Sequence, residues 1–494
     1  MDKLTLYDRL GLPIDASADE IRHAYRQLVL RFHPDMNVDG GKTELFIDIQ
    51  QAYEHLSDPA QKASYDNQLT AESFISSPLK VFTYFSQPSL ARLLEPQLIY
   101  SLLELKIRPD TNQLVSTTPL NISLIVDCST SMRGIRLDTV KLTAIDLVRQ
   151  LQPNDLFSLV KFNDRAELLI PAGKLSDIRS TEMKIQLLQA GGGTEIFKGL
   201  EMGFSQVSQF RSSDRVNHII LITDGRTYGD EGSCDKLADQ SSALGISISA
   251  IGIGSQWNDK FLDDITSKTG GICKYISDIG DMRRSILSEI SRLGSNLTEQ
   301  IMFNYKTPQY VELRSAFRLQ PDPSPLVPGP ALIFGLMPKQ GTMNILLEFL
   351  VKDIPSVLTD FTLANGFINF EIPRHKERTK YVQRLLLDRK ITKEPIRDSP
   401  PTKIINAMTS LNLYLMQERA RDEMAKGDVN SATRHMENLA THLLRKGENG
   451  LAQTVLDEVA YIQKNKSFSK DGEKRLKYGT RSLLLTAGNE EKNS

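Results

Sequence analysis

Short apolar runs alternate with longer amphipathic segments in the middle of this chain, from Asn121 to about Leu293. The apolar runs have the length of buried strands, and helical patterns lie between them. Alternation of this kind produces a parallel sheet that helices cover on both faces, so it predicts a doubly wound α/β domain. The predicted strands are Asn121–Val126, Leu156–Lys161, Val216–Thr223, Ile246–Ile253 and Ile272–Ile276, with Ala166–Ile170 as an edge strand.

Five polar side chains stand at the carboxyl ends of these strands or directly after a triple-glycine turn. They are Asp127, Ser129, Ser131, Thr194 and Asp224. Ligands of such sheets bind in the loops beyond the carboxyl ends of the strands. Two carboxylates and three hydroxyls make a hard-oxygen site that suits magnesium, with manganese or calcium as alternatives. Taken singly, the hydroxyl residues could merely cap helices, and Asp224-Gly225 could merely form a turn.

The order Asp-x-Ser-x-Ser, then Thr, then Asp resembles the von Willebrand factor A-type domain and its metal-ion-dependent adhesion site. The resemblance implies that the three hydroxyl residues are ligands and that the two aspartates hold the ion directly or through water. It also implies that an acidic side chain of a partner protein completes the coordination shell. Thr130 stands where many bacterial relatives have glycine, so we expect a metal loop of somewhat altered shape. Cys128 has no basic partner in the sequence and is interpreted as a small core residue.

A basic amphipathic helix is predicted near the N-terminus, from the capping box that starts at Ser17 to about Phe32. Pro34 biases the residue before it away from the helical conformation and ends this helix. A second helix is predicted from Thr43 to Leu56, and the two helices would form an antiparallel hairpin. Its tip displays His33-Pro34-Asp35, which as an isolated string would be no more than a solvated turn.

The hairpin and its flanking residues, among them Tyr7, Leu10 and Tyr65-Asp66, resemble the J domain of DnaJ-type co-chaperones. The resemblance implies docking on a heat-shock-70 (DnaK-type) chaperone and stimulation of its ATP hydrolysis. The Gly/Phe-rich linker and the zinc-binding cysteines that follow many J domains are missing, so another domain is expected to choose the client. The implied chaperone-docking residues are His33, Pro34, Asp35, Arg22, Arg26 and Arg31.

The remaining sequence predicts a β-sandwich followed by helices. Asn365-Gly366 between two apolar runs favours a type I′ hairpin. The strand-like run Leu98–Ile107 precedes the α/β domain and could pair with the later sheet, which would make the sandwich discontinuous in sequence. The pattern becomes helical from Thr402. These helices are expected to pack on the sandwich, with a tetratricopeptide-like peptide groove as the alternative.

The chain is therefore predicted to be a multidomain α and α/β protein with an N-terminal helical J domain, a flanking β-sandwich and C-terminal helices. The expected parts are a J domain (1–69), a linker (70–96), a strand segment of the sandwich (97–120), the A-type domain (121–295), the sandwich (296–388), a helical region (389–486) and a disordered tail (487–494).

Composition excludes several other classes of function. The net charge of −1 gives no general attraction to nucleic acid or to an anionic membrane. The three cysteines include no C-x-x-C pair, which fits a reducing compartment. No apolar stretch has the length of a membrane span, and no signal peptide is visible, so we expect a cytoplasmic protein.

These observations predict a co-chaperone that binds a heat-shock-70 machine through its J domain and a specific protein through magnesium. A second hypothesis is a metal-dependent scaffold, for example for an AAA-type ATPase complex, in which the J domain only docks a partner. An enzyme is the weakest hypothesis, because no nucleophile–base pair or phosphate loop accompanies the metal motif.

Overall fold

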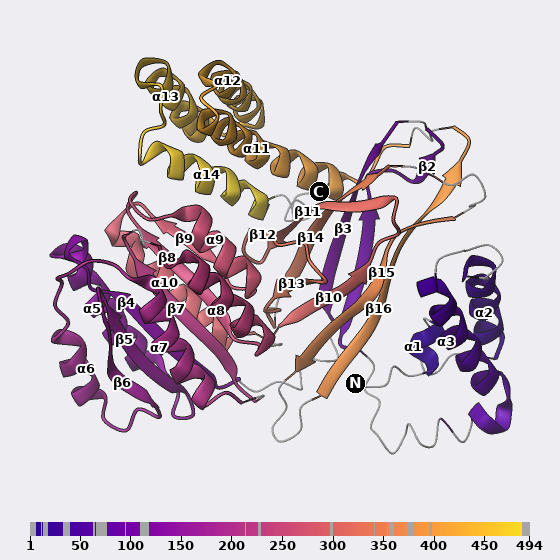
Figure 1. Ribbon diagram of the computed structural model, residues 1–494, viewed down its shortest axis with the longest axis horizontal. Coiled ribbons are helices and arrows are strands. Elements are labelled where there is room, and N and C mark those ends of the chain that lie inside the picture. The colour runs from indigo at the N-terminus through magenta and orange to yellow at the C-terminus, as the bar shows by residue number, and fades with distance from the viewer. Residues whose placement is uncertain are drawn as a thin grey trace.

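The computed structural model places the α/β domain, the sandwich and the N-terminal helices side by side, with the C-terminal helices above the first two (Figure 1). The predicted fold class is confirmed. No helix among the described residues is long and apolar enough to cross a membrane. The structure describes residues 6–10, 12, 18–32, 40–62, 65, 77–93, 95–108, 118–212, 214–225, 229–296, 300–339, 341–352, 354, 360–372, 379–394 and 398–486.

The α/β domain contains one six-stranded sheet, and all of its strand pairs are parallel except the one that holds the edge strand β6. The two central strands are buried along their whole length, as a sheet covered on both faces requires. In sheet order, the strands are β6 (Ala166–Gly173), β5 (Leu156–Phe162), β4 (Leu120–Asp127), β7 (Val216–Thr223), β8 (Ser247–Ile253) and β9 (Cys273–Ile276).

Two hydrophobic cores fill the space between this sheet and its helices, one on each face. One face is covered by α5 (Ile135–Gln150), α6 (Ile178–Gln186) and α10 (Ile279–Gly294). The other face is covered by α7 (Ile196–Gln209), α8 (Glu231–Ala243) and α9 (Asp259–Lys268). Each helix buries one apolar stripe, which is the sequence pattern that predicted it.

The β-sandwich consists of two five-stranded sheets that enclose a third core. In sheet order, the first sheet contains β1 (Leu79–Phe85), β3 (Gln97–Ile107), β14 (Thr342–Val351), β11 (Val311–Gln320) and β12 (Ser324–Leu326). The second contains β13 (Ala331–Gly335), β10 (Ile301–Lys306), β15 (Asp360–Ile372), β16 (Thr379–Thr392) and β2 (Ser89–Ala91). Because β3 pairs with β14 over ten residues, the sandwich is built from segments on both sides of the α/β domain.

The segment expected to be a linker, 70–96, contributes two strands to the sandwich. Strand β1 pairs with β3 from Leu79 to Phe85, and β2 pairs in parallel with the end of β16. Leu79, Phe85 and Leu90 enter the sandwich core. Both strands are short and surrounded by serine and proline, so their partners, and not their own pattern, identify them. The sandwich also extends past the expected boundary at 388, to Thr392.

The predicted hairpin at Asn365-Gly366 is wrong, because both residues lie inside the continuous strand β15. They pair with Lys306 and Tyr305 of β10 on one side. A Cβ atom on Gly366 would lie only 2.0 Å from the carbonyl oxygen of Asn304. The glycine therefore permits a close approach of two strands, and it does not form a turn.

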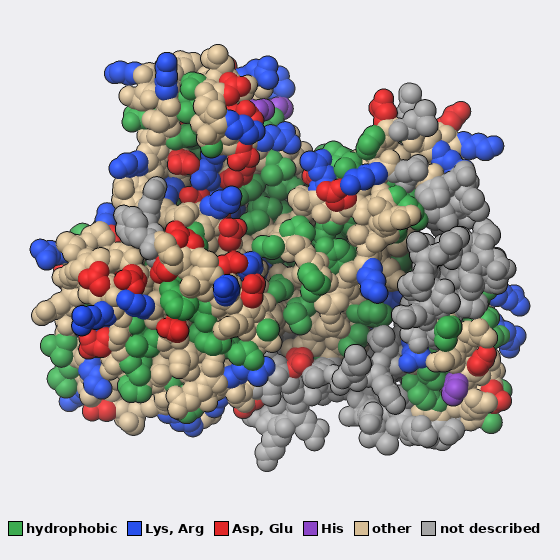
Figure 2. Space-filling view, viewed as in Figure 1, with side chains coloured by type: hydrophobic (Ala, Val, Ile, Leu, Met, Phe, Trp, Pro, Cys, Tyr) green, Lys and Arg blue, Asp and Glu red, His purple; other side chains and the backbone are tan. Residues whose placement is uncertain are grey.

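Four C-terminal helices share a core of their own, and they also contact the sandwich and, through Tyr478, the α/β domain. They are α11 (Thr402–Ala425), α12 (Val429–Lys446), α13 (Asn449–Asn465) and α14 (Gly472–Thr486). Ile404, Leu411 and Leu484 pack on the outer face of the first sandwich sheet, as expected. Charged side chains of both signs gather where these helices meet the α/β domain (Figure 2). The expected tail, 487–494, lies outside the described residues.

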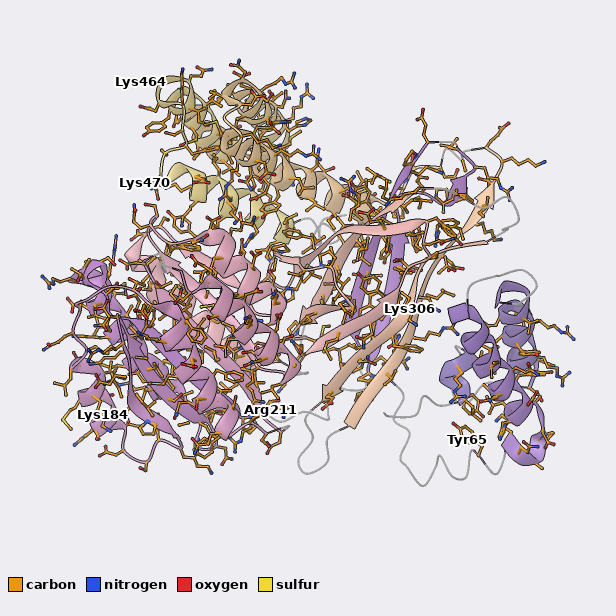
Figure 3. The ribbon with its side chains drawn as sticks, viewed as in Figure 1. Tyr65, Lys184, Arg211, Lys306, Lys464 and Lys470 are labelled. Atoms are coloured by element: carbon orange, nitrogen blue, oxygen red, sulfur yellow. The ribbon has the colours of Figure 1, made fainter. Side chains whose placement is uncertain are left out.

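The N-terminal domain contains α1 (Leu6–Leu10), α2 (Ala18–Phe32) and α3 (Gly40–Ser57) around a small core. The rings of Tyr25 and Tyr53 stack with centroids 3.8 Å apart and join α2 to α3. Tyr65 lies at the edge of this domain (Figure 3), and its hydroxyl accepts a hydrogen bond of 2.8 Å from the backbone N–H of Leu6. The domain lies beside β16, where Arg384 donates to the carbonyl oxygen of Arg9.

Candidate metal centre

The two predicted acidic residues come together because they end neighbouring parallel strands. Strand β4 leads into Asp127, and β7 leads into Asp224; the two strands pair in register up to Val126 and Ile222. Both carboxylates therefore lie at the same edge of the sheet, where ligands of such folds bind.

Asp127 is fully buried, and both of its oxygens accept hydrogen bonds. Its Oδ1 atom accepts from the backbone N–H of Ser129 at 2.8 Å, and its Oδ2 atom accepts from the Thr223 hydroxyl at 2.6 Å. Burial raises the pKa of this carboxyl group to about 6, although the hydrogen bonds from Ser129 and Thr223 oppose that rise. A divalent cation nearby would stabilise the ionised form.

The two serines connect the first aspartate to the second. The hydroxyl oxygens of Ser129 and Ser131 lie 3.0 Å apart, and the Ser131 hydroxyl donates to Asp224 Oδ1 at 2.7 Å. Asp224 is almost completely buried. Four of the five predicted site residues thus form one continuous hydrogen-bonded set, which the Ser129 backbone N–H joins to Asp127.

Thr194, the fifth predicted residue, reaches the same place from the turn before α7. Gly225 follows Asp224, and a Cβ atom on it would lie 3.0 Å from Thr194 Oγ1 and 3.6 Å from Asp127 Oδ2. The Thr194 hydroxyl and the Asp127 carboxylate therefore both face the backbone of Gly225. All five predicted side chains lie at one site.

The turn that carries Thr194 is held by polar contacts from two neighbouring loops. Asp164 accepts a hydrogen bond of 2.7 Å from the Gly193 N–H, and the Asn163 amide donates to the Gly191 carbonyl oxygen at 2.7 Å. The Thr130 hydroxyl donates to the Gly192 carbonyl oxygen at 2.9 Å. Thr130 thus ties the loop after β4 to this turn.

The chemistry of these residues fits a magnesium ion. All the converging side-chain atoms are oxygens of carboxylates or hydroxyls, which are the hard ligands that magnesium prefers, and the set leaves positions for water or an outside carboxylate. No group of three or more His, Cys, Asp or Glu side chains that could hold a metal occurs among the described residues. The site depends on three hydroxyls instead of a larger acidic cluster, so its negative charge is low.

Two residues of the site were not identified from the sequence. Thr223, the last residue of β7, orients Asp127, and Arg136, in the first turn of α5, forms an ion pair with Asp224 Oδ2. A hydroxyl at the end of a buried strand could have suggested the first contact. Nothing in the sequence pairs Arg136 with Asp224, because the two are 88 positions apart.

Cys128 faces the core of the α/β domain and is 1% exposed. Burial, with the neighbouring Asp127, raises the pKa of its thiol to about 12. The side chain is therefore a protonated packing residue, and thiolate chemistry at neutral pH is not available to it.

The predicted chaperone-docking residues lie on a separate domain. Arg22 and Arg26 are exposed on α2, and Arg22 lies 3.6 Å from Asp19 in an exposed ion pair. His33, Pro34 and Asp35 lie outside the described residues, and so does the side chain of Arg31. The structure thus places part of the basic helix and leaves the tip triad a prediction.

Comparison with known proteins assigns the three parts of the chain separately. The family model of the DnaJ domain matches residues 5–66, that of the von Willebrand factor type A domain matches 121–288, and that of the Sll0103-like, C-terminal alpha-helical domain matches 402–486. The uncharacterized protein sll0103 of Synechocystis is 33% identical over 180 residues, which is 36% of this chain and 43% of that protein. The chaperone protein DnaJ of Streptococcus agalactiae is 47% identical over 66 residues, which is 13% of this chain and 18% of that protein. The chain thus matches less than half the length of these curated relatives.

Two solved structures share the fold over most of the chain. The von Willebrand factor type A structure from Catenulispora acidiphila aligns with a TM-score of 0.64 and 14% identity, over 82% of this chain and 98% of that one. The ArnB paralog VWA2 from Sulfolobus acidocaldarius aligns with a TM-score of 0.52 and 16% identity, over 83% and 99%. Taken with the domain matches, these similarities show that the chain is a J-domain protein that carries a von Willebrand factor type A domain.

Proposed function

We propose that this chain is a cytoplasmic co-chaperone that delivers a specific client to a heat-shock-70 (DnaK-type) ATPase. The J domain recruits the chaperone and stimulates its ATP hydrolysis, and the A-type domain captures the client through magnesium. The observation that carries the proposal is the occurrence, in one chain, of a J-domain match and five converging oxygen side chains at the A-type sheet edge. We assign the chain no catalytic chemistry of its own.

Magnesium, when bound, supplies a positive charge that an acidic side chain of the client can approach. Asp127 and Asp224 would hold the ion directly or through water, and Ser129, Ser131 and Thr194 would supply neutral oxygens. Because the site itself offers only two carboxylates, a client carboxylate can serve as a further negatively charged ligand of the ion. The ion pair of Asp224 with Arg136 reduces the available negative charge further.

The J domain presents its chaperone-docking charges on a rigid helix. Arg22 and Arg26 are exposed on α2, where they can steer an acidic surface of the partner chaperone toward the domain. His33, Pro34 and Asp35 lie within the matched residues 5–66, and the J-domain resemblance implies that they stimulate ATP hydrolysis. In Figure 1, α2 is drawn on the side of the J domain away from the sandwich.

The substitution His33→Gln should abolish stimulation of the partner chaperone's ATPase and leave the fold unchanged, because no core contact is expected of this residue. Phosphate release by a DnaK-type chaperone in the presence of the full chain measures the effect. The matched control is His55→Gln, which makes the same change at an exposed residue of α3. Stimulation by the His33→Gln variant at the wild-type level would contradict the co-chaperone proposal and favour the metal-dependent scaffold.

The substitutions Asp127→Ala and Asp224→Ala should each weaken magnesium binding more than about tenfold, because only neutral hydroxyls and one carboxylate would remain. Client capture should fall in parallel, while ATPase stimulation by the J domain should persist. Calorimetry measures magnesium binding. Client capture is measured by pull-down from a lysate with and without chelator, and the captured proteins are identified by mass spectrometry.

Two further variants separate a ligand role from loss of folding. Asp127→Asn keeps the shape of the side chain and can still accept from the Ser129 N–H, so it should fold and still lose magnesium. Asp138→Asn, at an exposed residue of α5, should change neither property. Capture that is insensitive to chelator, or normal magnesium binding by Asp127→Asn, would exclude the adhesion-site mechanism.

A further inference from the structure

Arg136 occupies the side of the metal site that faces solvent. Its Nη1 atom pairs with Asp224 Oδ2, and the same atom lies 3.3 Å from the carbonyl oxygen of Ser131, which it donates to. The Arg136 side chain is 34% exposed, whereas the Asp224 side chain is 0% exposed. The Arg136 side chain therefore contacts the buried Asp224 carboxylate and is itself partly exposed to solvent.

The turn after β8 leaves room for the guanidinium group. Gly254 has a φ of +66°, and a Cβ atom on it would lie 3.3 Å from Arg136 Nη2. A larger residue there would be strained and would press on the guanidinium. The Arg136 side chain therefore lies between Ser131 and the turn at Gly254, which together fix its position.

Both oxygens of Asp224 are occupied in this arrangement. Ser131 donates to Oδ1, and Arg136 pairs with Oδ2. A cation that approaches Asp224 must displace one of these two partners or bind beside a positive charge. Displacement loses a hydrogen bond or an ion pair, and binding beside Arg136 is opposed by the repulsion of like charges, which is strong at short range in a partly buried site.

We propose that Arg136 is an internal competitor of the divalent cation for Asp224 and thereby sets the metal concentration at which the A-type domain becomes competent for capture. This inference rests on the proposed function, because it requires that the site bind a metal. Without metal, Arg136 neutralises a buried carboxylate that would otherwise stand alone. With metal, the cation takes over that task and the guanidinium is released toward solvent.

The test compares magnesium binding by the full-length wild type with three variants, by calorimetry. Arg136→Gln removes the competing charge and should bind magnesium about tenfold more tightly. Arg136→Lys keeps the charge and should stay near the wild type. Arg133→Gln removes the same charge from an exposed residue of the same loop, whose side chain makes no hydrogen bond or ion pair with the described residues, and it should have little effect.

Thermal unfolding provides a second readout that does not depend on a partner. In the presence of chelator, Arg136→Gln should melt below the wild type, because Asp224 is left buried without a cation. Saturating magnesium should raise the melting temperature of this variant more than that of the wild type. The only tryptophan, Trp257, donates to the Gly254 carbonyl oxygen at 2.7 Å, so its fluorescence can follow the same titration next to Arg136.

The outcomes distinguish this inference from the metal site itself. If wild type and Arg136→Gln bind magnesium equally tightly, or if Arg133→Gln tightens binding as much as Arg136→Gln, the competitor role is wrong and the metal site stands. If neither the wild type nor Arg136→Gln binds magnesium, manganese or calcium, the metal site is wrong and the inference fails with it. If Arg136→Gln binds magnesium more tightly than the wild type and Arg133→Gln does not, both the metal site and the competitor role of Arg136 are supported.

Discussion

A chain that begins at Asn121 should fail to form the β-sandwich and should aggregate, because it lacks β3 at the interior of the first sheet. The edge of β14 would then present unpaired backbone groups along its length. Each large apolar side chain in a core contributes about 1.5–3 kcal/mol, so the total loss approaches the roughly 5–15 kcal/mol that holds a typical domain together. The lost core residues are Leu79, Phe85, Leu90, Ile99, Leu103 and Leu105.

The structure suggests a graded series of truncations for this experiment. A chain from Ser77 lacks the J domain but keeps β1, β2 and β3, and it should remain monomeric with a melting temperature near that of the full chain. A chain from Gln97 loses β1 and β2 and should be intermediate, since β3 becomes an exposed edge. Light scattering and thermal unfolding measure the series. A monomeric Asn121 chain that is as stable as the Ser77 chain would show that β3 is dispensable.

The site was more predictable from the sequence than its surroundings were. Asp127 and Asp224 each follow a strongly apolar run, and parallel strands bring their carboxyl ends to one edge, so local patterns sufficed to place them together. Thr223 and Arg136 were not predicted, because their roles depend on which side chains they contact in the folded structure. For Arg136 and Asp224, which are 88 positions apart, a single sequence contains no direct signal.

The errors in the fold arose where a distant partner outweighs a local signal. Asn365-Gly366 carries the residues of a tight turn, yet β10 approaches so closely that glycine is needed within a strand. Strands β1 and β2 are short and lie among serines and prolines. Strand β2 pairs with β16, more than two hundred residues later, and Ser77, just before β1, bonds to Gln383. Strand β1 pairs with β3, whose other neighbour β14 also lies more than two hundred residues later. Local periodicity cannot report such pairings.

The contact between α14 and the A-type domain was also unexpected, and it rests on buried charges. Asp263 of α9 accepts hydrogen bonds of 2.8 and 2.7 Å from the two terminal nitrogens of Arg481, and Lys477 lies 2.7 Å away. Asp259 pairs with Lys477 and, at 3.0 Å, with Arg421 of α11. Two carboxylates and three cations therefore join the C-terminal helices to the A-type domain.

Asp263 should stay ionised to unusually low pH. Burial alone would raise the pKa of this carboxyl group, but Arg481 and Lys477 outweigh burial and lower the pKa to about 2. The ordinary value for an unfolded chain is about 3.9. A depressed pKa in the folded state means that this carboxylate contributes its full stability above about pH 4 and loses it as the pH falls toward 2.

The substitution Asp263→Ala should lower the free energy of unfolding by roughly 3–5 kcal/mol, because it leaves Arg481 buried without its anion and leaves Lys477 with Asp259 alone. The C-terminal helices should loosen first, so hydrogen exchange at the backbone of α14 should accelerate before that of the A-type sheet. Denaturant unfolding measures the stability. The matched control is Asp264→Ala, the next residue of α9, which is exposed and should change stability little.

The pH dependence and a compensating variant show whether the buried charges cause the effect. The stability difference between wild type and Asp263→Ala should shrink as the pH falls from about 4 toward 2, since the wild-type carboxylate becomes protonated there. Replacing Asp263 with Leu and Arg481 with Met together removes the unpaired charge and should recover part of the loss. A loss that is constant with pH, or a double variant that is no more stable than Asp263→Ala alone, would mean that the loss does not come from the unpaired buried charge.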